Sequence, residues 1–398
     1  MNATSLILTI LVSAAALAIA IVLFFWWRRR HLANLDLKIL AIRIPRHDKE
    51  DGERDFAKQI NLSEQLFVAL SSIGRPFVFE ASVLNTGEEI RFYLAVPRAS
   101  LEFARKTVQG FFLDAQVEET SDYTIFETGS QAAAGYLSLD KHFVLPVASY
   151  RESEADIFSP ILSTLSKLAE NDEGASIQVV VSPTGDTAKK EIAHILEKLR
   201  EGKSLKELTD TGLSLKKIGE EIGKAVFDKK YEKDEGPKLA DEEMVKAVQL
   251  KIAKTLFAVN VRIVTAASTK GRAEDILMSV SSSFSKLASP VRNSFKVVKP
   301  KKINQLVFRY VFRETDDRRA MILNAEELAG IFHLPTETSD VPNVTWLRAK
   351  EAPPPEVLPP TGLVLGQSIF RGVEKTIRVT DEDRRRHTYI IGQTGTGK

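Results

Sequence analysis

The sequence predicts an α+β protein: an N-terminal transmembrane helix, then ferredoxin-like α+β modules, then the start of a P-loop α/β domain. Three observations lead to this prediction. Residues 5–27 form one uncharged apolar run, and the middle of the chain alternates strand-like and helix-like segments. Residues 392–398 fit the phosphate-binding pattern G-x-x-x-x-G-K.

The apolar run at 5–27 is mostly Leu, Ile, Val and Ala, and about 20 such residues span a bilayer as a helix. Trp26 and Trp27 close the run and three arginines follow, which favours an interface and then the cytoplasmic side. Residues 1–31 therefore predict a single-pass anchor in the inner or plasma membrane, with the N-terminus outside and the body in the cytoplasm. A cleaved signal peptide is disfavoured, because no charge precedes the run and bulky aromatic residues end it.

The composition limits the classes of function. The chain of 398 residues is 43% hydrophobic, which is enough material for two or three cores. It has no cysteine, so disulfide frameworks and thiolate chemistry are excluded, and its six histidines show no metal-ligand spacing. Because 55 basic residues nearly balance 53 acidic ones, the bulk charge does not indicate a nucleic-acid binder.

Residues 32–186 predict two small α+β modules. In the first, two strand-like runs flank a turn and precede an amphipathic helix and a third strand. These segments are 77–83, 91–96, 100–112 and 123–127. In the second, a strand, a helix that begins at Ser159-Pro160 and a β-branched strand follow one another. These strands are 142–147 and 176–182.

Residues 187–250 are rich in Lys and Glu with sparse apolar residues, and they predict a charged helical insertion. Residues 251–350 predict a third module, in which strands at 259–263 and 306–313 flank a helix. Within it Asn324 and Glu327 predict a capping box at the start of a helix over 324–334. The Pro-rich segment 351–361 predicts an extended linker, and 362–398 begins a new domain with two strands.

The best basic cluster in the chain consists of four lysines shortly before the expected strand at 306–313 of the third module. They are Lys296, Lys299, Lys301 and Lys302. A solvated hairpin surface and a contact with DNA or anionic lipid are both open. The three arginines Arg384, Arg385 and Arg386 are similarly ambiguous, because Asp381, Glu382 and Asp383 can balance them.

The phosphate-binding motif follows a short apolar strand at 387–391, the context that this motif requires. Its glycines let backbone N–H groups surround a phosphate, and its lysine meets the charge of the β- and γ-phosphates. The predicted nucleotide-binding residues are Gly392, Gln393, Thr394, Gly395, Thr396, Gly397 and Lys398, with Lys398 also catalytic. The hydroxyl that would hold Mg²⁺ comes one residue later in this motif, so a chain ending at Lys398 is expected to be incomplete and inactive by itself.

The segment 324–335, the Pro-rich linker, Leu365-Gly366 and the motif resemble the entry to the ATPase domain of the HerA–FtsK superfamily. Within this superfamily, the chain most resembles the membrane-anchored ATPases of type IV secretion and conjugation, including the coupling proteins. This resemblance implies ATP and Mg²⁺ as cofactors, a homo-hexamer, and contacts with the membrane, with DNA through the ATPase domain, and with secretion-channel proteins.

The expected function is therefore the N-terminal part of a membrane-anchored ATPase that drives translocation of DNA or a protein–DNA substrate. Two alternatives stay open at this point. One is a HerA-like DNA-processing ATPase at the membrane, and the other is a non-catalytic, membrane-tethered scaffold.

Overall fold

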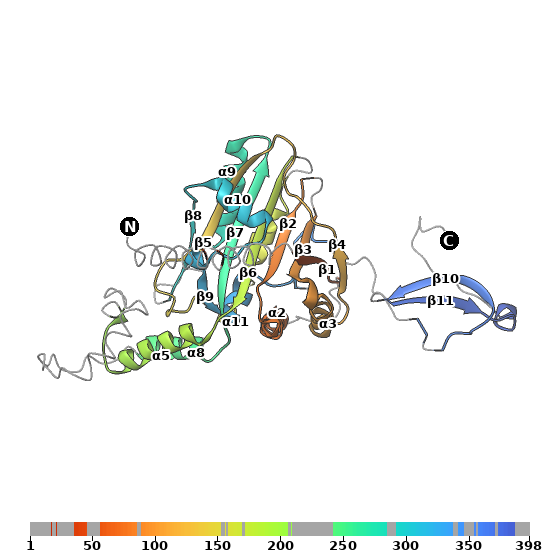
Figure 1. Cartoon of the computed structure of the whole chain (residues 1–398), viewed down its shortest axis with the longest axis horizontal. Helices are drawn as coiled ribbons and strands as arrows, with labels where there is room; N and C mark the ends of the chain where they lie inside the picture. The colour runs from red at the N-terminus through yellow and green to blue at the C-terminus, as the bar shows by residue number, and fades with distance from the viewer. Residues whose placement is uncertain are drawn as a thin grey trace, which may run out of the picture.

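The computed structural model contains a body with one large sheet and a separate β-hairpin (Figure 1). It describes residues 17, 21, 36–45, 56–85, 89–152, 156, 158–168, 172–205, 208, 242–284, 292–336, 341–345, 354–355, 357–370 and 373–386.

The first half of the body is a βαββαβ unit. Its elements are β1 (Leu37–Arg43), α2 (Phe56–Leu70), β2 (Phe77–Val83), β3 (Ile90–Pro97), α3 (Leu101–Phe111) and β4 (Gln116–Thr120). All its strand pairs are antiparallel, and the strands lie in the order β4-β1-β3-β2. This is the split βαβ arrangement, in which the two helices cover one face of the sheet.

The second half repeats this arrangement. Its elements are β5 (Gln131–Leu139), α4 (Ser159–Leu165), β6 (Gly174–Pro183), β7 (Leu256–Ala267), α9 (Lys270–Phe284) and β8 (Phe295–Val298). The strand order β8-β5-β7-β6 is that of the first unit, element for element. Between β6 and β7 the chain leaves the sheet through α5 (Asp186–Arg200) and returns through α8 (Glu242–Ile252), which pack on each other through their own apolar cluster.

Antiparallel pairing of β2 with β6 joins the two units into one continuous sheet. Because the same strand of each unit lies at the junction, the units are related by an approximate two-fold axis. Glu80 faces Gln178 near this axis. Short strand β9 (Met321–Asn324) extends the sheet by pairing with the start of β7. The remaining elements are 3₁₀ turns η1 (Ser71–Ile73), η2 (Arg98–Ser100), η4 (Asp317–Arg319) and η5 (Asp383–Arg385), helices α10 (Ile303–Val311) and α11 (Ala325–Ile331), and strands β10 (Leu363–Phe370) and β11 (Val373–Val379).

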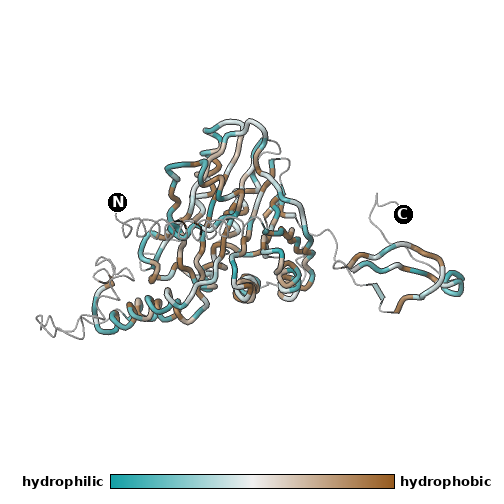
Figure 2. Tube along the Cα trace, in the orientation of Figure 1, coloured by the Kyte–Doolittle hydropathy of each residue, from teal (hydrophilic) through white to brown (hydrophobic). Residues whose placement is uncertain are grey.

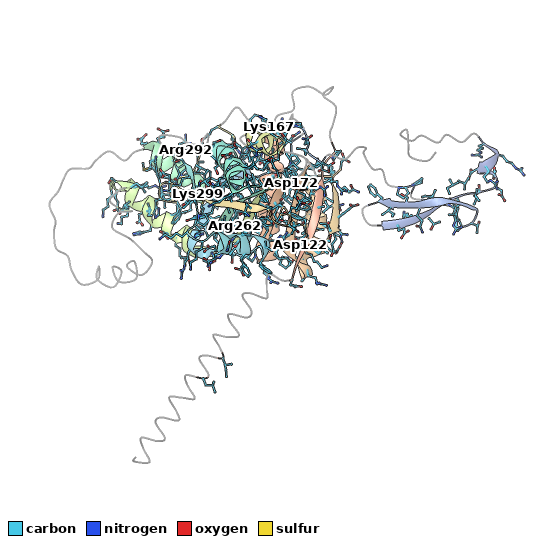
Figure 3. The ribbon with its side chains drawn as sticks, turned by 90° about the horizontal axis from the view of Figure 1, so that it is seen from above. Asp122, Lys167, Asp172, Arg262, Arg292 and Lys299 are labelled. Carbon is cyan, nitrogen blue, oxygen red and sulfur yellow. The ribbon has the colours of Figure 1, made fainter. Side chains whose placement is uncertain are left out.

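The two faces of the sheet differ in chemistry. The inner face carries the main apolar core against α2, α3, α4, α9 and α11, and Phe332 at its centre contacts the rings of Phe79, Phe92 and Phe158. Figure 2 shows the strands of the large sheet as largely apolar, whereas polar and apolar residues alternate along α5 and α8. The outer face is covered by α10 and by the loop after β4. In Figure 3, Lys167 after α4 and Asp122 in that loop lie on opposite sides of the sheet.

Helix α11 begins with the capping box expected from the sequence. The Asn324 side chain accepts from the Glu327 N–H, and the Glu327 carboxylate accepts from the Asn324 N–H. The same carboxylate lies 3.0 Å from the Nζ of Lys251 on α8, and both side chains are almost fully buried. Burial lowers the pKa of Lys251, while the Glu327 charge opposes that change. Glu327 therefore both caps α11 and compensates a buried cation.

Replacement of Glu327 by Ala should lower the free energy of unfolding by about 3–5 kcal/mol, because it leaves Lys251 as an uncompensated buried charge. Urea denaturation measures this loss. The double variant Lys251→Met with Glu327→Gln should recover most of it, since no charge is then buried and the amide can still cap. A loss below about 1 kcal/mol for the single variant would show that Lys251 carries no charge in the fold.

A second buried ion pair holds the end of α11. The Nε2 atom of His333 lies 3.0 Å from a carboxylate oxygen of Asp156, and His333 is fully buried. Burial alone would raise the pKa of Asp156, but the His333 charge and the N–H groups of Phe158 and Ser159 outweigh it and lower the pKa to about 2. Burial likewise opposes the charged form of His333, yet Asp156 raises its pKa overall.

This pair should stabilise the fold most between about pH 4 and pH 6.5. The Asp156 contribution is present above its unfolded pKa of 3.8 and is lost as the pH falls through about 2. The His333 contribution is complete below 6.5 and is lost as the pH rises through its raised folded pKa. Asp156→Asn should therefore cost about 2 kcal/mol at pH 5.5 and less at pH 9, as measured by urea unfolding at each pH. An equal cost at both values would contradict a charged His333.

The predicted fold class is wrong in its membrane part. Among the described residues, no helix is long and apolar enough to cross a membrane. The longest, α2, α5 and α9, have 15 residues each, and such a helix rises only about 22 Å against a hydrocarbon core of about 30 Å. The segment 5–27 lies outside the described residues except for Leu17 and Ile21. The same finding contradicts the predicted localisation as a single-pass membrane protein.

The modules are also arranged differently from the prediction. Separate small modules were expected, but β6 before the insertion and β7 after it pair within one sheet. Segments 123–127 and 142–147 are loops, and 306–313, expected to be a strand, is mostly helix α10. Six of its eight residues are apolar, so the segment has no clear polar–apolar alternation. Leu306 and Tyr310, four residues apart, are both buried, and that spacing fits one face of a helix equally well.

Candidate functional site

The predicted nucleotide site lies beyond what the structure describes. Residues 392–398, from Gly392 to Lys398, and the preceding strand at 387–391 are outside the described residues. The chain that leads to them is described as far as Arg386. Strands β10 and β11, expected from the sequence, form an antiparallel hairpin with a register shift between Val364 and Gly366.

The arginines before the motif are balanced by acidic neighbours. Arg384 lies 3.4 Å from Asp381, and Arg386 lies 3.6 Å from Glu382 and 4.0 Å from Asp383. All these side chains are exposed, so each pair contributes little to stability. The local pairing favours a solvated turn over a dedicated contact surface for DNA or a neighbouring subunit.

A row of polar side chains crosses the outer face of the sheet at the junction of the two units. Glu80 on β2 pairs in register with Gln178 on β6, which pairs with Arg262 on β7. The Arg262 guanidinium donates to Gln178 at 2.7 Å, and the Gln178 amide donates to Glu80 at 2.7 Å. All three side chains are buried. Each polar atom in such a position needs a partner, and the row supplies most of them.

This row also holds α10 against the sheet. The last carbonyls of a helix have no partner within it. Arg262 donates to the carbonyl oxygens of Arg309 and Glu314, and Gln178 donates to that of Tyr310 at 2.9 Å. A cation at this end also suits the helix dipole. Burial and the neighbouring Arg309 charge lower the pKa of Arg262 to about 9, so the guanidinium is still charged at neutral pH.

Arg313 completes the network from the other side. It has a positive φ of 53°, which turns the chain directly after α10. Its guanidinium lies 3.0 and 3.1 Å from the two carboxylate oxygens of Glu80 and 3.0 Å from Asp122. Burial opposes its charge, but these two carboxylates raise its pKa overall. Tyr123 donates to Glu80 at 2.6 Å, and burial together with the Glu80 charge raises the pKa of this tyrosine.

Helix α10 presents its other side to solvent. Leu306 and Tyr310 face the sheet, whereas Phe308 and Phe312 are exposed and contact each other as a tilted pair, with ring centroids 4.5 Å apart. The basic cluster expected from the sequence adjoins the N-terminal end of this helix. Lys296 pairs with Asp140, and among the described residues Lys299, Lys301 and Lys302 form no ion pair.

Two pockets lie on other parts of the body. One, of about 530 Å³, lies between α4 and α9 and is lined by five hydroxyl groups with Lys167 and Arg272, but Glu173 already pairs with Arg272 at 2.6 Å. The other, of about 250 Å³, lies where α8 meets α11. Its cations and carboxylates pair with one another, as Lys251 does with Glu327. Neither pocket combines unpaired cations with exposed aromatic rings, as the exposed side of α10 and its flanking lysines do.

The polar row was not identified from the sequence, although a signal was present. The strand Phe77–Val83 is apolar apart from Glu80 and Ser82, and Asn260 and Arg262 interrupt a similar run in β7. Buried charged residues in otherwise apolar strands are rare unless they are paired. Their partners lie about 80 to 230 residues away in the sequence, and local patterns do not connect such positions.

The fold defines a body of two βαββαβ units in one sheet, with a row of buried polar side chains across its outer face. A family model described as Domain of unknown function (DUF8128) matches residues 40–347, and the chain belongs to this family. The match spans both units and α11 and ends before the hairpin and the motif at 392–398. No curated protein matches the chain.

Replacement of Arg313 should weaken the packing of α10 against the sheet. Arg313→Ala leaves the buried carboxylate of Glu80 without its cation and should cost about 3–5 kcal/mol in urea unfolding. Hydrogen exchange of the α10 amides should accelerate in this variant. Asp122→Ala is the matched control, because its side chain is 62% exposed and it should cost less than about 1 kcal/mol. Equal effects of the two variants would contradict a special role for the Arg313–Glu80 pair.

Proposed function

We propose that this protein is a P-loop ATPase of the HerA–FtsK type that uses ATP and Mg²⁺ to move DNA or a protein–DNA substrate, acting as a homo-hexameric ring. The observation that carries the proposal is the motif Gly392-Gln-Thr-Gly-Thr-Gly-Lys398 after an apolar strand-like segment. Its donor set fits a nucleoside triphosphate: backbone N–H groups for phosphate oxygens, and one lysine for the β- and γ-phosphate charge.

The hairpin ahead of the motif supports a folding unit separate from the body. No described residue of β10 or β11 is buried, and Figure 1 shows the hairpin apart from the sheet. Leu363, Leu365 and Ile369 are at least half exposed. Two strands alone are marginally stable in water, so these apolar side chains favour packing against further protein, as at the start of a nucleotide-binding domain.

The division of the chain supports a separate role for the body. The motif and the hairpin lie outside the family match, which covers the tandem units. In this proposal the residues from 392 onwards bind and use the nucleotide, while the body contacts the substrate or partner proteins. Secretion-channel proteins are one class of partner that this role would suit.

Replacement of Lys398 by Ala in the gene product should lower ATP turnover on the order of 10²-fold or more, because it removes the positive charge from the γ-phosphate. Phosphate release measures this, with and without DNA. Lys375→Ala on the exposed face of β11 is the matched control and should keep turnover unchanged. DNA should stimulate the unmodified protein.

The outcomes separate the alternatives. Turnover that DNA does not stimulate, with no DNA binding even at low salt, would reject translocation of DNA and favour a motor for protein. Turnover unaffected by Lys398→Ala, or no ATP binding at all, would reject the ATPase and favour a non-catalytic scaffold.

A further inference from the structure

The exposed side of α10 and the segments flanking the helix combine cations with aromatic rings. We define the α10 surface by Lys299, Lys301, Lys302, Phe308, Phe312 and Arg318. Phe308 and Phe312 are 51% and 37% exposed. Most apolar side chains of this size are buried in the body, so two exposed phenylalanines in contact at one helix indicate a contact surface.

The charge around this surface is strongly one-signed. Residues 295–320 contain eight Lys and Arg but only three Asp and Glu, whereas the whole chain carries a net charge of only +2. Four of these cations are already paired, because Arg309 and Arg319 lie beside Asp316, Arg313 pairs with Glu80, and Lys296 pairs with Asp140. Lys299, Lys301, Lys302 and Arg318 form no ion pair with described residues. The surface is therefore complementary to an anionic partner.

The surface is held on a rigid support. Leu306 and Tyr310 anchor α10 in an apolar cluster on the sheet, and Arg262 and Gln178 bind its last carbonyl groups. Beside it, Arg319 stacks over the ring of Tyr136 at 4.3 Å and lies 3.8 Å from Asp316. The exposed rings are thus held by a fixed helix and the cations lie directly beside it, which lowers the entropic cost of binding.

We propose that the α10 surface binds a single-stranded segment of nucleic acid. Unpaired bases stack on exposed aromatic rings while lysines track the phosphates, and this combination is typical of single-strand binding. A duplex would leave the two rings unused, because its base faces are covered. The proposal rests on the proposed function in identifying the anion as a nucleic acid.

An anionic membrane surface is the competing partner, and the composition of the helix disfavours it. Asn304 and Gln305 share the exposed side of α10 with the two phenylalanines. Amide groups cost free energy in hydrocarbon but can hydrogen-bond to base edges. A helix that lies in a membrane interface would instead present a continuous apolar side.

Fluorescence anisotropy of a labelled 20-nucleotide oligo-dT with the full chain tests the proposal. The triple variant Lys299→Gln, Lys301→Gln, Lys302→Gln should weaken binding at least about tenfold at 50 mM salt and reduce the salt slope by about 2, since each single-strand phosphate contact contributes about 0.7. Phe308→Ala with Phe312→Ala should weaken binding about tenfold with an unchanged salt slope.

The matched control is the triple variant Lys189→Gln, Lys190→Gln, Lys203→Gln, which removes the same charge from exposed positions on and after α5. It should bind oligo-dT like the unmodified protein, and circular dichroism should show that all variants are folded. Equal loss in both triple variants, or unchanged binding by the α10 variants, would overturn the proposal. So would α10-dependent binding to vesicles with 30% phosphatidylglycerol without binding to oligo-dT, which would assign the surface to a membrane.

The two proposals can fail independently. If DNA stimulates ATP turnover but the α10 variants bind oligo-dT normally, the surface assignment is wrong and the proposed function stands. If Lys398→Ala changes nothing but the α10 variants lose oligo-dT binding, the surface assignment stands and the ATPase is rejected.

Discussion

The antiparallel pairing of β2 with β6 is the contact on which the rest of the structure depends. Each βαββαβ unit would otherwise expose this strand as an open edge, with a row of unpaired N–H and C=O groups. Joining the two edges satisfies them and aligns the inner faces, so that one apolar core runs beneath both units. Helix α11 lies at the centre of this core, where Phe332 contacts rings from both halves.

The same pairing creates the polar row on the outer face. Glu80 and Gln178 are opposite each other only because β2 and β6 are in this register, and a shift by one residue would put their side chains on opposite faces of the sheet. Once buried, they require partners, which Arg262 and Arg313 supply. These arginines then fix the end of α10. The orientation of the exposed side of α10 thus follows from a junction between strands far from it in sequence.

Two kinds of site result, with different origins. The proposed nucleotide site depends on a short local motif, in which seven consecutive residues carry the chemistry. The proposed nucleic-acid surface depends on a helix placed by long-range contacts. If both proposals hold, the residues that bind the nucleotide and those that contact the nucleic acid lie in separate segments of the chain.

Local signals predicted much of the chain correctly. The strands at 77–83 and 91–96, the helix after residue 100, the capping box of Asn324 and Glu327, and the hairpin before the motif all follow from neighbouring residues. Such features depend on propensity, periodicity and hydrogen bonds within a few positions, which the sequence contains directly. Tertiary structure alone decided the joining of β2 to β6, the helical state of α10 and the burial of Glu80 and Arg262. The run 306–312 is apolar except for Arg309, which fits a strand or a helix, and only packing against β5 and β7 selects the helix. Partners about 80 to 230 residues apart leave no local pattern, because their pairing is a property of the assembled sheet.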